Sequence, residues 1–110
     1  MSNTRWIQRF ENLQKAINNL LEAKKCIEQD GLSKIYTMAL IQAFEIAFEL
    51  SWKTMKNYLE YNGIVVDTPR SAIKESFANH IITNGQSWID MMEARNTTSH
   101  TYNEEYANEL

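Results

Sequence analysis

Three side chains that could do chemistry together fall within eight residues near the C-terminal end of the sequence: Arg95, His100 and Tyr102. An imidazole such as that of His100 can take or give a proton near neutral pH. The guanidinium of Arg95 can bind a phosphate through a fork of donors and stabilise charge that develops on phosphorus. These two groups are sufficient for metal-free RNA cleavage by attack of a 2′-hydroxyl.

One copy of this set is sparse, because such a reaction calls for both a base and an acid. A symmetric dimer that brings two copies face to face would supply the second set. An arginine and a histidine five residues apart also occur often by chance. The alternative interpretation is therefore a helix end at which both residues only pack and cap.

The helix that carries the arginine is predicted to begin at residues 87–90, which resemble a capping box. The face that holds Trp88 continues in helical steps to Arg95, so the arginine points inward and needs an anionic partner. Residues 96–99 are poor helix formers whose side chains compete for backbone hydrogen bonds. We therefore expect a bulge or break there, which would let Arg95 and His100 point into one cleft.

A partner for Arg95 is predicted on a long helix that runs from about Ser33 to Tyr61. Two apolar stripes lie side by side on this helix, which indicates the centre of a bundle and a share in a dimer interface. A polar seam also follows it, and either Glu45 or Glu49 could orient the arginine. The alternative is that the seam is a solvated face.

Two further helices are predicted around the central one. A heptad-like apolar stripe predicts a helix from residue 2 or 3 to about residue 29, packed nearly antiparallel to its neighbour. Thr68-Pro69 is a helix start signal, and the apolar pattern continues to about Ile82. His80 is expected to be a partly exposed residue of this helix and not a catalytic one.

Length and composition limit the fold and the environment. A chain of 110 residues with three Gly and one Pro favours a single all-α domain over residues 1–110. No apolar run approaches the roughly 18 residues of a membrane span, and the N-terminus lacks the apolar core of a signal peptide. We therefore expect a cytoplasmic protein that does not bind membranes.

Cysteine, histidine and charge limit the chemistry. The single Cys26 lies on a helical pattern with no nearby histidine and is predicted to be a packing residue and not a nucleophile. Two His and one Cys far apart argue against a zinc site, and no metal or cofactor is expected. The net charge of −3 argues against broad nucleic-acid binding but leaves room for a small local phosphate site.

The stretch Arg95-Asn96-Thr97-Thr98-Ser99-His100 matches the motif of the HEPN superfamily: arginine, a polar residue, three variable residues and histidine. Thr101-Tyr102 adds the tyrosine of its HepT-like branch. Residues 42–53 and 68–70 resemble the nucleotidyltransferase substrate-binding proteins of the same superfamily. The likeness covers residues 35–106, so the chain resembles this group of partners of minimal nucleotidyltransferases.

The resemblance implies an up-and-down four-helix bundle with a short fifth C-terminal helix. Such proteins form homodimers in which two motifs line a shared cleft. Arg95 and His100 would carry a metal-independent endoribonuclease activity, Asn96 would help to shape the cleft, and the nucleotidyltransferase would silence this toxin by adenylylating Tyr102. Residues 103–110 supply only about two turns of the closing helix, so that helix is expected to be incomplete.

Three hypotheses follow from the sequence. The first is the ribonuclease half of a toxin–antitoxin pair. The second is a non-catalytic subunit that binds nucleotide or presents substrate to a nucleotidyltransferase, with Tyr102 still open to modification. The third is a helical oligomerisation domain without a functional site.

Overall fold

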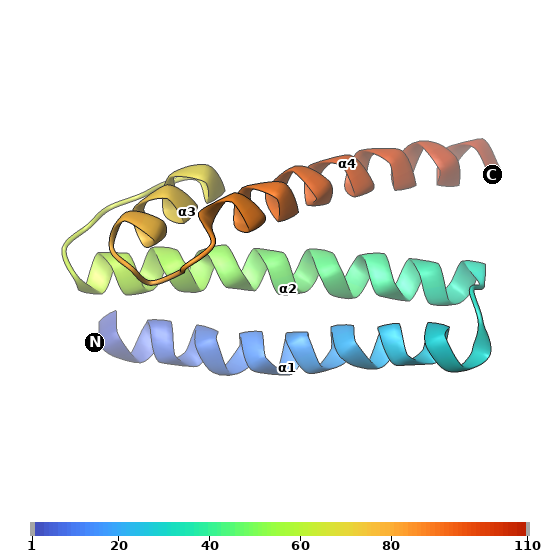
Figure 1. Ribbon diagram of the computed structural model, residues 1–110, viewed down its shortest axis with the longest axis horizontal. Coiled ribbons are helices and arrows are strands. Elements are labelled where there is room, and N and C mark those ends of the chain that lie inside the picture. The colour runs from blue at the N-terminus through green and yellow to red at the C-terminus, as the bar shows by residue number, and fades with distance from the viewer. Residues whose placement is uncertain (1, 110) are drawn as a thin grey trace.

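A computed structural model describes the backbone of residues 2–109 and the side chains of residues 5–98. This part of the chain contains helices and no strand, which confirms the all-α prediction. The four helices are α1 (Ser2–Asp30), α2 (Lys34–Tyr61), α3 (Pro69–Ala78) and α4 (Gly85–Glu109). They form an elongated body with extents of 46 × 24 × 24 Å. Figure 1 shows α1 and α2 antiparallel, with α3 and α4 across α2 from α1.

Helix α2 is the central element, as the sequence predicts. Within the described residues, α1, α3 and α4 each pack against α2, and no Cα atom of α1 lies within 8 Å of one in α3 or α4. Burial of an aliphatic side chain contributes about 1.5–3 kcal/mol, so one shared apolar cluster is enough to hold α3 and α4 on α2. This core cluster consists of Phe48, Met55, Leu59, Val66, Ala72, Ile73 and Met92.

Helix α1 is held through its interface with α2. Leu13 is the larger of its well-buried side chains, and much of its apolar stripe stays exposed. Near the start of α1, the Trp6 ring meets the Tyr58 ring edge-on, with centroids 4.9 Å apart. At the other end of this interface, the Tyr36 hydroxyl donates to Asp30 Oδ2 over 3.1 Å. The predicted antiparallel packing is confirmed (Figure 1).

Helix α2 ends where the sequence predicts. The Gly63 N–H donates to the Glu60 carbonyl over 2.9 Å, and the Ile64 N–H donates to the Leu59 carbonyl over 2.8 Å. Gly63 has a φ of 85°, in the left-handed region that this end pattern requires. The asparagine-glycine pair at residues 62–63 therefore stops the helix for a local, sequence-encoded reason.

Helix α3 begins as predicted but ends earlier, at Ala78 and not at about residue 82. Its end has the same pattern as that of α2. The Ile81 N–H donates to the Ser76 carbonyl over 2.8 Å, and the His80 N–H donates to the carbonyl three residues before it. His80 takes the glycine position with a φ of 62°. It is exposed, as expected, but lies just beyond the helix and not within it.

Helix α4 begins at Gly85, before the predicted capping box. The side-chain oxygen of Asn84 accepts a hydrogen bond from the Ser87 N–H over 3.1 Å, so Asn84 is the cap. Asp90, the expected partner of Ser87, instead accepts from the Gln86 amide over 2.9 Å. The prediction of a capping box at residues 87–90 is therefore wrong by one turn.

The C-terminal residues belong to α4. The stretch expected to form a short fifth helix continues α4 without interruption as far as Glu109. Within the described residues, the four-helix arrangement is open between α1 and α4, because these two helices lie against different sides of α2. None of the helices in this described part has an apolar stretch long enough to cross a membrane.

Candidate functional site

Arg95 lies where α4 passes α2. Its Nη1 atom is 3.7 Å from Glu49 Oε2, and 27% of its side chain is exposed. Its guanidinium carbon lies 5.3 Å from the centroid of the Phe48 ring, which is a cation–π distance. The Nε atom of Arg95 is buried and has no hydrogen-bond partner. The side chain is partly open to solvent, so the other donors of the guanidinium can meet an incoming acceptor.

Glu49 sits between two cations. One carboxylate oxygen faces Arg95, and the other lies 3.4 Å from Lys53 Nζ. Both contacts are partly exposed, and each contributes less than about 1 kcal/mol to stability because solvent screens them. Glu45, the other candidate on the same seam, makes no ion pair with Arg95 in the described part of the chain. The arrangement orients the arginine more than it stabilises the fold.

The expected break in α4 does not occur. The helix runs through residues 96–99 without interruption. The Thr98 hydroxyl donates to the Arg95 carbonyl over 3.2 Å, so this side chain bonds within the helix instead of ending it. On a regular helix, two positions five residues apart are separated by about 140° around the helix axis. The prediction that a bulge aligns Arg95 with His100 is therefore wrong.

The remaining residues of the motif divide into two groups. Asn96 is exposed. His100 and Tyr102 lie on the backbone of α4, but their side chains are outside the described residues. The structure therefore brings Arg95 and Glu49 together and leaves the geometry of His100 and Tyr102 as a prediction.

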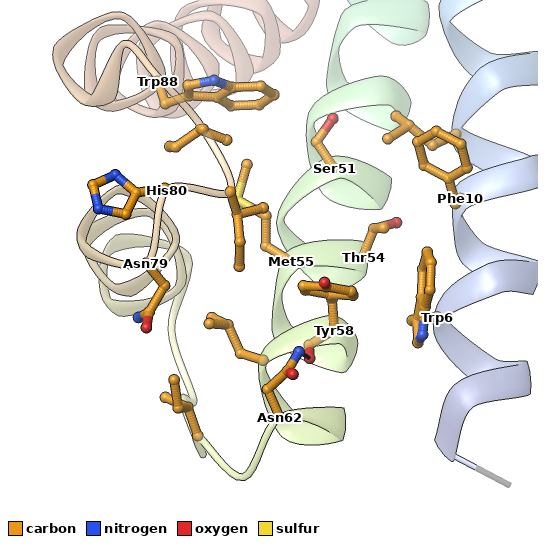
Figure 2. Close-up of a pocket in the computed structure, with 15 residues that line it drawn as sticks. Trp6, Phe10, Ser51, Thr54, Met55, Tyr58, Asn62, Asn79, His80 and Trp88 are labelled. Atoms are coloured by element: carbon orange, nitrogen blue, oxygen red, sulfur yellow. Dashed lines mark hydrogen bonds between the residues drawn. The ribbon is translucent and has the colours of Figure 1, made fainter.

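An apolar groove of about 640 Å³ follows the other side of α2. Figure 2 shows Trp6 and Phe10 of α1 facing Trp88 of α4, with Met55 and Tyr58 of α2 between them. The connection that contains His80 forms one edge of the groove. The sequence does not predict this groove, because its lining comes from three helices and two connections. The signal present in the sequence is the 4,3,4 spacing of positions 51, 55, 58 and 62.

Metal-binding groups do not gather in the described part of the chain. No three side chains among its His, Cys, Asp and Glu residues lie close enough to hold a metal ion. Cys26 is free and half-buried. The chemistry available near Arg95 is that of hydrogen-bond donors and charge.

Comparison with known proteins defines the class. Residues 8–110 match the family described as nucleotidyltransferase substrate binding protein like. The chain belongs to this family, the HepT-like group of HEPN proteins, as the motif and the helical fold predict.

A curated relative from Haemophilus influenzae bears the name "Probable ribonuclease HepT". The two proteins are 32% identical over 94 residues, which is 81% of this chain and 62% of the relative. The chain thus spans less than two thirds of the length of that relative.

Proposed function

We propose that this protein is the ribonuclease partner of a minimal nucleotidyltransferase and cleaves RNA without a metal ion. The single observation that carries the proposal is the setting of Arg95, the first residue of the motif. It is half-buried, with its Nη1 atom 3.7 Å from Glu49 Oε2 and its guanidinium carbon 5.3 Å from the centroid of the Phe48 ring. An arginine side chain held in this way can bind a phosphate without first losing conformational freedom.

The reaction assigns a role to each residue of the motif. A 2′-hydroxyl attacks the adjacent phosphorus while a base removes its proton, and the bond from phosphorus to the leaving 5′-oxygen breaks as an acid protonates that oxygen. The products are a 2′,3′-cyclic phosphate and a free 5′-hydroxyl. Arg95 binds the phosphate oxygens, and His100 carries a proton as acid or base. Asn96, exposed on the same turn, shapes the cleft.

The dimer supplies the second proton carrier. Because α4 is regular through the motif, Arg95 and His100 start from different sides of one helix. A homodimer in which two α4 helices meet face to face would bring the Arg95 and His100 of both copies to a common phosphate, so that one imidazole acts as base and the other as acid. This pairing replaces the single-chain cleft that a break in α4 would have made.

The decisive test compares RNA cleavage by the wild type and three variants. We expect His100→Ala and Arg95→Ala each to lower the rate by roughly 100-fold or more, since general acid–base catalysis and charge stabilisation each contribute factors of this size. Lys74→Ala, an exposed residue of α3, is the control and should cleave as the wild type does. Equal cleavage by wild type and His100→Ala would refute the ribonuclease assignment.

Control by the nucleotidyltransferase is the second part of the proposal. Adenylylation of Tyr102 would place phosphate charge and a nucleoside beside the motif, where they would exclude the RNA phosphate. In this way the transferase would act as the antitoxin. The test is mass spectrometry after incubation with the transferase and ATP. The adduct should appear on the wild type and be absent from Tyr102→Phe.

A non-catalytic role is the second candidate, favoured by the description of the matching family as substrate-binding proteins. In that role the chain would present a nucleotide or another substrate to the transferase and cut no RNA. Transferase activity on a third molecule that depends on this chain, together with intact RNA in the cleavage assay, would select it.

A further inference from the structure

A small polar pocket lies between α1 and α2, away from the apolar groove. Its volume is about 130 Å³. Four of the side chains that line it are cationic and one is anionic, in a chain whose net charge is −3. The lining consists of Arg5, Arg9, Trp52, Lys53, Lys56, Asn57 and Glu60. Positive charge is therefore concentrated at one place on an otherwise acidic protein.

Several donors of this pocket have no partner among the described residues. Arg5, Arg9 and Lys56 make no ion pair or side-chain hydrogen bond there. The indole Nε1 of Trp52 is buried without an acceptor. Asn57 is only 5% exposed, and its amide oxygen is also buried and unpaired.

Buried polar groups without partners destabilise a fold, so a site that keeps them is suited to a ligand that can supply the missing hydrogen bonds. The oxygen and nitrogen of an amide are interchangeable in their assignment, and the buried end of Asn57 can equally present an N–H donor. A ligand rich in acceptors would then satisfy the asparagine, the indole and the cations together.

The size and chemistry of the pocket select a phosphate group. Pockets for drug-sized ligands measure about 300–1,000 Å³, so a volume of about 130 Å³ holds a small anion and no base or sugar. Guanidinium forks and ammonium groups are the side chains that bind phosphate oxygens most strongly.

We propose that this pocket binds a backbone phosphate of a single-stranded RNA whose neighbouring phosphate is held at Arg95, an inference that rests on the proposed ribonuclease function.

The link between the two positions is Glu49. This carboxylate contacts Arg95 on one oxygen and Lys53 on the other, and Lys53 lines the pocket. Positions 49, 53, 56 and 60 follow 4,3,4 spacing and therefore share one face of α2. An RNA strand carries a phosphate at every nucleotide, so one strand can occupy both positions. A single free phosphate ion could occupy only one of the two positions.

The test uses the full chain and a fluorescent 2′-O-methyl oligonucleotide, which cannot undergo attack by a 2′-hydroxyl. The pocket variant is Arg9→Gln/Lys56→Gln, and the control is Arg70→Gln/Lys74→Gln, which removes the same charge from exposed positions on α3. We expect the pocket variant to bind roughly tenfold more weakly at low salt. The slope of log affinity against log salt should fall by about 0.7, because the contact with one phosphate is lost.

The outcomes separate this inference from the proposed function. Cleavage by the wild type with equal oligonucleotide affinity for both double variants would overturn the pocket and leave the ribonuclease intact. Pocket-dependent binding without cleavage would support the phosphate site and refute the ribonuclease. Unchanged oligonucleotide binding with loss of the complex with the nucleotidyltransferase would overturn the RNA assignment in favour of an acidic protein surface. Circular dichroism melting verifies folding, and Lys56→Glu is an independent single variant that changes the pocket charge by the same two units and should also weaken binding.

Discussion

On one side of α2, positions such as Met55 and Tyr58 face an apolar groove of about 640 Å³, while on the other Lys53 and Lys56 face a polar pocket of about 130 Å³. The same two helices, α1 and α2, contribute to both. On the groove side, packing continues into the buried core cluster. Among the described residues, the groove side also has an unpaired buried donor, Trp6 Nε1, whereas on the pocket side the unpaired Trp52 Nε1 and Asn57 amide oxygen lie beside several cationic side chains. The difference fits the proposal that one side of α2 stabilises the fold and the other binds a ligand.

The largest effect should come from the core under the groove. Leu59 is 0% exposed and packs with Ile73, which is 1% exposed. Leu59→Ala should lower the free energy of unfolding by about 3 kcal/mol, from lost burial and the cavity that remains. Lys56→Ala, on the pocket side, should change it by less than about 0.5 kcal/mol. Urea denaturation measures both, and comparable losses would break the division between the two sides.

A smaller effect is expected at the edge of the groove. His80 has a φ of 62° at a position that suits glycine, and a left-handed residue with a Cβ is disfavoured by about 1–2 kcal/mol. Part of this cost is offset by the extra chain entropy of glycine when unfolded, so His80→Gly should stabilise the protein by about 0.5–1 kcal/mol.

Gly63 offers the matched control for this change. It holds the same position at the end of α2, with a φ of 85°. Gly63→Ala should therefore destabilise the protein by about 1 kcal/mol. Denaturation curves in which both substitutions shift stability in the same direction would contradict the shared end pattern.

The pocket side should respond in binding and cleavage more than in stability. Glu49→Gln removes the carboxylate between Arg95 and Lys53, which should reduce stability by less than about 1 kcal/mol. Oligonucleotide affinity should rise by roughly threefold as a repulsive charge is lost, while the cleavage rate should fall because Arg95 is no longer oriented. Glu45→Gln removes the same charge one turn earlier and should leave cleavage unchanged.

The smallest effect concerns the end of the α1–α2 interface at which Tyr36 meets Asp30. The hydrogen bond to Asp30 raises the pKa of Tyr36 above its ordinary value. The contribution of this bond to stability is therefore fully present below the ordinary tyrosine pKa and is lost as the pH rises through the raised value.

An absorbance titration of tyrosinate should show one late-titrating group that Tyr36→Phe removes and Asp30→Asn returns to the ordinary range. If thermal melting at neutral pH showed a large loss of stability for Tyr36→Phe, this end of the α1–α2 interface would contribute more to stability than the groove side or the pocket side of α2 does.

Local signals explain where the sequence predicts the fold well. The starts of α2 and α3 follow from nearby caps, Ser33 and Thr68, whose partners lie within three residues. The errors arise where two local solutions compete. Asn84 and Ser87 are both good caps, and His80 ends α3 although nothing in its side chain demands a left-handed conformation.

The candidate site depends on packing that spacing cannot supply. Arg95 needs an anion, and the sequence offers Glu45 and Glu49 on the same seam; the position at which α4 crosses α2 selects Glu49. Thr98 looked like a helix breaker, yet its hydroxyl bonds inside the helix. The polar pocket was hidden for the same reason, since its cations come from α1 and α2 at distant positions in the chain.

In the part of the chain that the structure describes, α1 packs against α2 and no other helix, which has a consequence for local opening. Within the described residues, α1 can detach without disturbing the core cluster, so its amide hydrogens should exchange with solvent in a cooperative unit separate from the rest. Detachment would remove Arg5 and Arg9 from the pocket at the same moment. An anion bound there favours the attached state by mass action, and saturation at 100 times its dissociation constant would slow this exchange by about 100-fold.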